Sequence, residues 1–154
     1  LEGEIVELSP IGSLHQGCIN RLTAILVRFA AQDFVVSIQG PVRLDENSEP
    51  QPDLALLNPS PDFYANAHPT PDDVLVLIEV SETSAAYDRE VKLPLYANRG
   101  IREAWIVDLE SGTIEVNDEP SSEGYGRTTT KRRGEVVHSS ALPELSMRAE
   151  DVLG

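Results

Sequence analysis

An acidic residue inside the most apolar stretch of the chain constrains the fold more than any other feature. Residues 74–80 read Val-Leu-Val-Leu-Ile-Glu-Val, a composition typical of a strand buried on both faces of a sheet. Strand alternation places Glu79 on the same face as Leu75, Leu77 and Ser81. Burial of an unpaired, ionised carboxylate costs several kcal/mol, so Glu79 needs a metal ion, a cationic side chain or a proton. An ion pair with an arginine, or a strand that ends early and exposes Glu79 to water, would also explain the residue.

The rest of the chain predicts helices and strands around this segment. Apolar residues at helical spacing predict a helix over residues 14–31, with Ser13 as its N-cap. A second helix is predicted over residues 83–98, where Pro94 should kink or divide it. Strands are predicted at residues 3–8, 34–39, 41–44, 53–57, 74–80 and 103–109. Residues 113–117 should form a hairpin with the last of these, and residues 127–133 and 135–138 a second hairpin. Between the hairpins, residues 118–126 predict a polar loop.

The core order is therefore helix, strand, strand, strand, helix, strand. A mixed central β-sheet flanked by helices is the natural packing of such a chain, in the α+β or α/β class, with additional β-hairpins. The chain has 154 residues and no internal repeat, so we expect a single domain over residues 1–154. A short helix is expected after Ser146.

Composition and charge limit the possible partners. The longest apolar run, residues 74–78, is too short to span a bilayer, so no membrane partner is expected. Cys18 is the only cysteine, which excludes an internal disulfide and favours a reducing, cytoplasmic location. The net charge of −14 opposes non-specific binding to a polyanion. It does not exclude nucleic acid, because a local basic patch or a bound cation can dominate at close range.

Asp53 is the second candidate site residue. It opens the strand that precedes the strand of Glu79, after Pro52. A Pro-Asp pair is common in turns and is weak evidence alone. Asp53 is a candidate because it lies one connection before the strand that carries Glu79. Two carboxylates that converge from neighbouring strands form a hard, oxygen-rich site suited to Mg²⁺ or Mn²⁺. Asp53 and Glu79 are therefore the predicted metal ligands, for one or two ions.

A set of short motifs in this order resembles the Uma family of restriction-endonuclease-like proteins, within the PD-(D/E)xK nuclease superfamily. The resembling stretches are Gly3–Pro10, His15, Pro52–Ala55, Ile78–Ser81, Asp88 with Lys92 and Tyr96, Gly100–Asp108 and Leu142–Leu145. The resemblance covers nearly the whole chain and implies a restriction-endonuclease-like core. It also implies that Asp53, Glu79 and Lys92 are catalytic.

The resemblance includes one departure from the wider superfamily. The lysine expected two residues after Glu79 is replaced by Ser81, and Lys92 in the following helix would supply that charge instead. Because Asp88 and Lys92 are four residues apart, a helix-surface ion pair is the alternative interpretation. The family pattern also suggests substrate or supporting contacts for His15, Ser81 and Tyr96. For His15 a capping role, and for Tyr96 simple packing, remain the alternatives.

The implied activity is Mg²⁺-dependent hydrolysis of nucleic-acid phosphodiester bonds by an endonuclease. A two-fold homodimer is expected, because one site per chain cuts both strands of a duplex most simply in that assembly. The first alternative is a non-catalytic module that keeps the nuclease fold to bind protein or nucleic acid, which the acidic charge favours. The second is a hydrolase that acts on another substrate through the same metal site.

Overall fold

The computed structural model describes residues 12–154, so the strand predicted at residues 3–8 lies outside the described part. Six strands form one mixed sheet in the order β1-β2-β3-β4-β5-β6. Their bounds are β1 Val35–Ile38, β2 Leu54–Leu57, β3 Val74–Ser81, β4 Glu103–Asp108, β5 Thr113–Ser121 and β6 Gly124–Arg132. Only the β3–β4 pair among these is parallel. The predicted mixed sheet is therefore confirmed.

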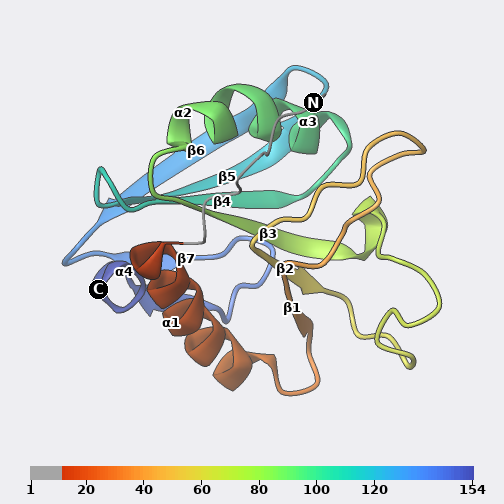
Figure 1. The fold of residues 1–154 in the computed structure, drawn as a ribbon, viewed down its shortest axis with the longest axis horizontal. Coiled ribbons are helices and arrows are strands. Elements are labelled where there is room, and N and C mark those ends of the chain that lie inside the picture. The colour runs from red at the N-terminus through yellow and green to blue at the C-terminus, as the bar shows by residue number, and fades with distance from the viewer. Residues whose placement is uncertain (1–11) are drawn as a thin grey trace, which may run out of the picture.

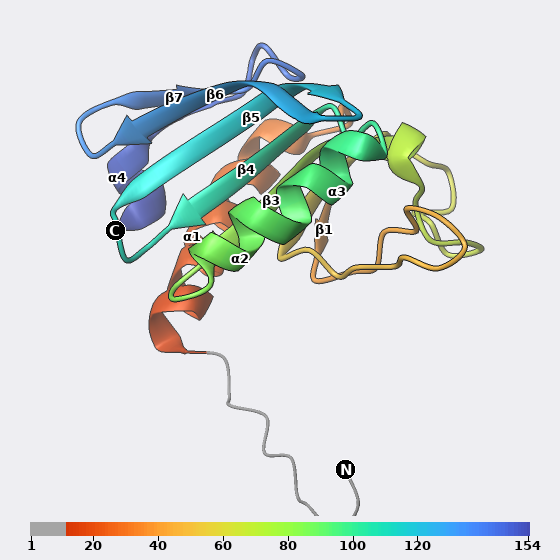
Figure 2. The ribbon, with the colours of Figure 1, turned by 90° about the horizontal axis from the view of Figure 1, so that it is seen from above.

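Helices cover both faces of this sheet (Figures 1 and 2). One face carries α1 (Ser13–Ala30), α4 (Ala149–Leu153) and a two-stranded sheet of β7 (Val136–His138) and β8 (Ser146–Arg148). The other face carries α2 (Ala85–Tyr87), η2 (Asp88–Lys92) and α3 (Leu93–Asn98), which follow one another without a break. A short 3₁₀ turn, η1 (Pro71–Asp73), precedes β3. None of the helices within residues 12–154 is long and apolar enough to cross a membrane.

Alternation along the central strands divides the core between the two faces. Leu54, Leu56, Val76, Ile78 and Trp105 pack toward α1, whereas Ala55, Leu57, Leu77 and Ala104 pack toward α3 and Tyr96. All eight residues of β3 are buried. Because β3 lies in the middle of the sheet, Glu79 is enclosed by neighbouring strands and by the helix above it.

Three sequence-based predictions about local structure were wrong. Gly12 rather than Ser13 holds the N-cap position of α1, without a side-chain hydrogen bond. Residues 41–44 form no strand. Residues 118–126 are not a loop: they are the end of β5, a turn at residues 122–123 and the start of β6. Polar side chains pair across these strands: Asp118 binds Arg127, and Thr128 donates to Asn117.

The second predicted hairpin was also wrong. Residues 127–132 pair with β5, and residues 136–138 pair with β8 instead. The hydrophobic pattern of residues 136–138 identifies a strand but not its partner, and the partner comes from the far end of the chain. The short helix predicted after Ser146 is present as α4, although β8 comes before it.

Candidate active site at the end of β3

Strand register brings Asp53 and Glu79 together. In the antiparallel β2–β3 pair, Leu54 lies opposite Ile78, so the next position along each strand sets Asp53 beside Glu79. The backbone N–H of Asp53 donates to Glu79 Oε1 over 3.3 Å. The backbone N–H of Val80 donates to Asp53 Oδ2 over 2.7 Å. The two acidic residues are thus fixed to each other by backbone hydrogen bonds at one end of the sheet.

Glu79 forms an ion pair with Lys92. Its side chain is 4% exposed, and Lys92 Nζ lies 2.5 Å from Glu79 Oε2. Burial raises the pKa of Glu79 to about 7, against the lowering effect of Lys92, while Asp53 and Asp88 add to the rise. The strand does not end early, since β3 continues to Ser81. An ammonium from the helix above, rather than an arginine or water, compensates this buried carboxylate.

Lys92 does not form a surface ion pair. Its ammonium lies 3.3 Å from Asp88 Oδ1, at the i,i+4 spacing, but Asp88 is 3% exposed and the same ammonium contacts the buried Glu79. Burial lowers the pKa of Lys92, yet Glu79 and Asp88 outweigh it and raise that pKa above its usual value. Lys92 therefore stays positively charged beside two buried carboxylates.

An irregular helical turn sets Asp88 and Lys92 above the sheet. The backbone N–H of Leu93 donates to the carbonyl of Asp88, five residues back, which widens residues 88–92 into a π-helical turn. Pro94 follows in the first turn of α3, and it has no N–H to offer the carbonyl of Glu90. The sequence predicted that Pro94 would kink or divide this helix. The irregularity is the π-helical turn of residues 88–92, directly before α3. Single π-turns of this kind are frequent at functional sites.

Ser81, two residues after Glu79 on the same face of β3, binds Asp88. Its hydroxyl is fully buried and donates a short hydrogen bond to Asp88 Oδ2. Sequence reasoning assigned Asp88 no role beyond a surface pair. Two signals could have indicated its burial: Ser81 shares the Glu79 face of β3, and Asp88 is one helical turn from Lys92.

His15 reaches the site from α1. Its Nε2 lies 3.3 Å from Asp53 Oδ1, and the side chain is 17% exposed. Within residues 12–154 its Nδ1 is buried without a hydrogen-bond partner. The contact between His15 and Asp53 is consistent with the supporting role that the resemblance implies for His15.

Tyr96 lies in the core beside the site. It is fully buried among the α3-side residues Leu57, Leu77 and Ala104. Its hydroxyl has no hydrogen-bond partner in the described part of the chain, so Tyr96 does not orient Lys92 by a hydrogen bond there. Burial raises the pKa of Tyr96 far above its usual value, and the nearby Glu79 and Asp88 raise it further.

Asp53 and Glu79 are the residues that could hold a hard divalent cation. They offer carboxylate oxygens on neighbouring segments at one end of the sheet. Residues 12–154 contain no group of three or more His, Cys, Asp or Glu arranged around a common metal position. Two carboxylates are nevertheless the usual protein contribution to a Mg²⁺ site, where water and substrate phosphate complete the coordination.

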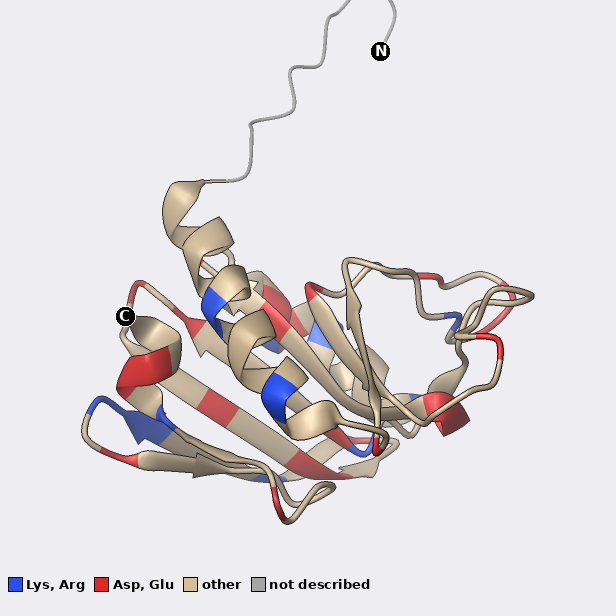
Figure 3. Ribbon diagram, turned by 90° about the horizontal axis from the view of Figure 1, so that it is seen from below, with Lys and Arg blue, Asp and Glu red and all other residues tan. Residues whose placement is uncertain are grey.

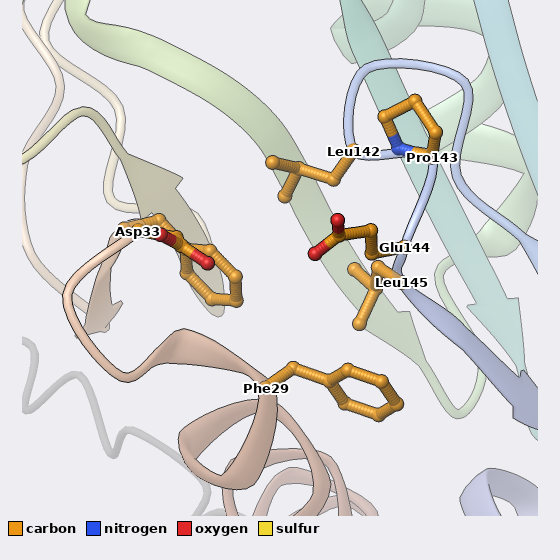
Figure 4. A pocket seen from close by; sticks show the side chains of 7 residues that line it. Phe29, Asp33, Leu142, Pro143, Glu144 and Leu145 are labelled. Atoms are coloured by element: carbon orange, nitrogen blue, oxygen red, sulfur yellow. The ribbon is translucent and has the colours of Figure 1, made fainter.

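A separate pocket lies away from these residues, between the end of α1 and the segment that precedes β8 (Figure 4). Phe29, Leu142 and Leu145 line it together with the carboxylates of Asp33 and Glu144. An apolar wall with two acidic groups and no basic lining residue does not suit a phosphate.

Comparison with known proteins agrees with this fold. A crystal structure of a putative nuclease belonging to DUF820 from Anabaena variabilis ATCC 29413 matches with a TM-score of 0.73 at 14% identity, over 99% of this chain and 87% of that one. At that identity the match demonstrates a shared fold alone. No curated protein sequence matches the chain. Residues 1–150 match the Uma2 family, described as "putative restriction endonuclease". The chain belongs to the Uma2 family of restriction-endonuclease-like proteins.

Proposed function

We propose that this protein is a Mg²⁺-dependent endonuclease that hydrolyses phosphodiester bonds in nucleic acid. The observation that carries the proposal is the convergence of Asp53, Glu79 and Lys92, with Lys92 Nζ 2.5 Å from Glu79 Oε2 and the Asp53 N–H 3.3 Å from Glu79 Oε1. Membership of the Uma2 family and the nuclease fold of the Anabaena protein support the same reaction class.

Each residue has a separate task in this proposal. Asp53 and Glu79 would hold one or two Mg²⁺ ions, which would supply an acidified water and neutralise charge on the phosphate. Lys92 orients the attacking water or stabilises the negative charge of the transition state. His15 supports Asp53 through their 3.3 Å contact.

The net charge of −14 is the main objection, and it favours the second candidate function. Acidic residues occur on strands, on loops and on α4 alike (Figure 3), so general electrostatic attraction for a polyanion is weak. A bound divalent cation would reverse the local charge at Asp53 and Glu79. If the site binds no cation, a non-catalytic nuclease-fold module that binds protein or nucleic acid accounts better for the charge.

The two lysines of the chain give a matched experiment. Lys92 lies in the site, whereas Lys131 lies on β6. We expect Lys92→Ala to lower the cleavage rate by about a hundredfold, on the order of one lost transition-state donor. Its Mn²⁺ affinity should stay equal or rise, because two carboxylates lose their fixed cation. Glu79→Ala should lose both Mn²⁺ affinity and cleavage, and Lys131→Ala should retain both.

The measurements are Mn²⁺ binding by calorimetry and cleavage of single- and double-stranded DNA and RNA, all at one fixed salt concentration. A Lys92→Ala protein that cuts as fast as its parent contradicts the catalytic role of Lys92. A parent protein that neither binds Mn²⁺ nor cuts any substrate supports the binding module instead. We further propose a homodimer for cleavage of a duplex, since each chain has one such site.

A further inference from the structure

The carboxylate of Asp88 has two oxygens with different partners. Oδ2 accepts a short hydrogen bond from the Ser81 hydroxyl, and the Ser84 hydroxyl lies 3.4 Å from the same oxygen. Oδ1 lies 3.3 Å from Lys92 Nζ. The two serines therefore fix the carboxylate plane, which leaves the other oxygen directed at the ammonium. Asp88 is also 3% exposed, so water does not compete for these contacts.

The backbone around Asp88 is fixed as well. The π-helical turn begins at Asp88, whose own carbonyl accepts the five-residue hydrogen bond from Leu93. The next residue, Arg89, anchors the turn to the sheet: its guanidinium donates to Asp108 over 2.8 Å and to Glu115 over 2.9 Å. The turn that carries both Asp88 and Lys92 is thus tied to β4 and β5 independently of Glu79.

Glu79 alone would be a poor holder for Lys92. In the proposed reaction its oxygens also serve a divalent cation, which competes with the ammonium for the same carboxylate. Asp88 donates no oxygen to that cation in the proposed reaction, and its own contact with Lys92 does not pass through Glu79. A catalytic group misplaced by about 1 Å can lose on the order of a hundredfold in rate, so a dedicated holder for Lys92 has a clear use.

We propose that Asp88 is the positioning residue of Lys92, and that Ser81 orients Asp88 for this task. The resemblance to the wider superfamily leads one to expect a lysine at position 81. Ser81 stands there instead, and it binds Asp88, which contacts Lys92. This inference rests on the proposed function, in which Lys92 acts on the phosphodiester. Asp88 touches neither phosphate nor cation in this arrangement, and acts through Lys92.

Because the sequence contains only Lys92 and Lys131, lysine-selective ¹³C labelling gives two side-chain signals, and Lys131→Arg assigns them. In the parent protein the two Hε protons of Lys92 should have distinct shifts and slow side-chain motion, as expected for a held ammonium. In Asp88→Asn the two shifts should merge and the motion should approach that of Lys131. This loosening of Lys92 should be larger with saturating Mg²⁺ than in EDTA, because Glu79 then binds the cation as well as Lys92. Ser81→Ala should loosen Lys92 in the same direction but less.

Kinetics provide the second readout. Asp88→Asn should lower kcat by about 10–100-fold, as expected for a misplaced catalytic group, while KM stays within about twofold because Asp88 does not touch substrate. Asp45→Asn is the matched control: it removes one carboxylate from an ion pair with Arg99, over 2.8 Å, outside the site. That variant should leave the Lys92 signals and kcat unchanged.

The outcomes test the positioning role of Asp88 separately from the proposed nuclease function. Lys92 signals in Asp88→Asn that match those of the parent, or the same loosening in Asp45→Asn, overturn the positioning role. If Asp88→Asn does not fold, Ser81→Ala decides by the same signals. A parent protein without any Mn²⁺-dependent cleavage overturns the proposed function alone, and the Lys92 signals still decide whether Asp88 holds that side chain.

Discussion

Replacement of Glu79 by glutamine should change how stability depends on pH, because burial raises the pKa of this carboxyl from 4.5 to about 7. Below about pH 4.5 the folded and unfolded chains both carry the proton, and above about pH 7 neither does. Between these values the folded chain keeps the proton that the unfolded chain has released. The unfolded state then binds fewer protons, so the free energy of unfolding falls as the pH rises.

The magnitude follows from the same two pKa values. One pH unit corresponds to about 1.4 kcal/mol, so a pKa raised from 4.5 to about 7 lowers the free energy of unfolding by about 3 kcal/mol across this window. Glutamine resembles the protonated acid but cannot ionise. Glu79→Gln should therefore match the parent near pH 4.5 and exceed its stability by about 3 kcal/mol near pH 8.

Urea unfolding in EDTA at half-unit pH steps measures this difference. The single tryptophan, Trp105, is fully buried and provides the fluorescence signal. Glu103→Gln is the matched control, because Glu103 is also fully buried but accepts hydrogen bonds from Trp105 Nε1, two serines and the Ala141 N–H. That variant should be less stable than the parent at pH 7 by about 1–3 kcal/mol. Parallel curves for Glu79→Gln and the parent from pH 4.5 to 8 would refute the reasoning.

Two further predictions concern the core and the assembly. Tyr96→Phe should keep or raise the free energy of unfolding, because the buried Tyr96 hydroxyl has no partner within residues 12–154; a loss above about 1 kcal/mol in urea unfolding would contradict this. Light scattering at micromolar concentration should report a dimer, whereas a monomer would argue against cleavage of both strands of a duplex by one assembly.

Local patterns in the sequence were sufficient for the core architecture. The apolar run around Glu79 predicted a central strand, and the helical spacing of residues 14–31 predicted a helix on one face of the sheet. An acidic residue in such a strand also called for a cation, a proton or contact with water. The pairing of β7 with β8 and the β5–β6 hairpin could not be predicted, because polar and short strands carry little periodic signal about their partners.

Tertiary structure alone decided which groups meet Glu79. Sequence spacing made Asp88 and Lys92 an ordinary i,i+4 pair, and this spacing alone does not distinguish a surface pair from a buried one. The π-helical turn ahead of Pro94 and the Arg89 anchor direct both side chains toward the sheet. The Ser81–Asp88 hydrogen bond joins residues on a strand and on the helix that crosses it. The position of Glu79 in an apolar strand thus required a cation, a proton or water for this acid. Only the packing of helix against sheet made Lys92 its cation and Asp88 the second partner of Lys92.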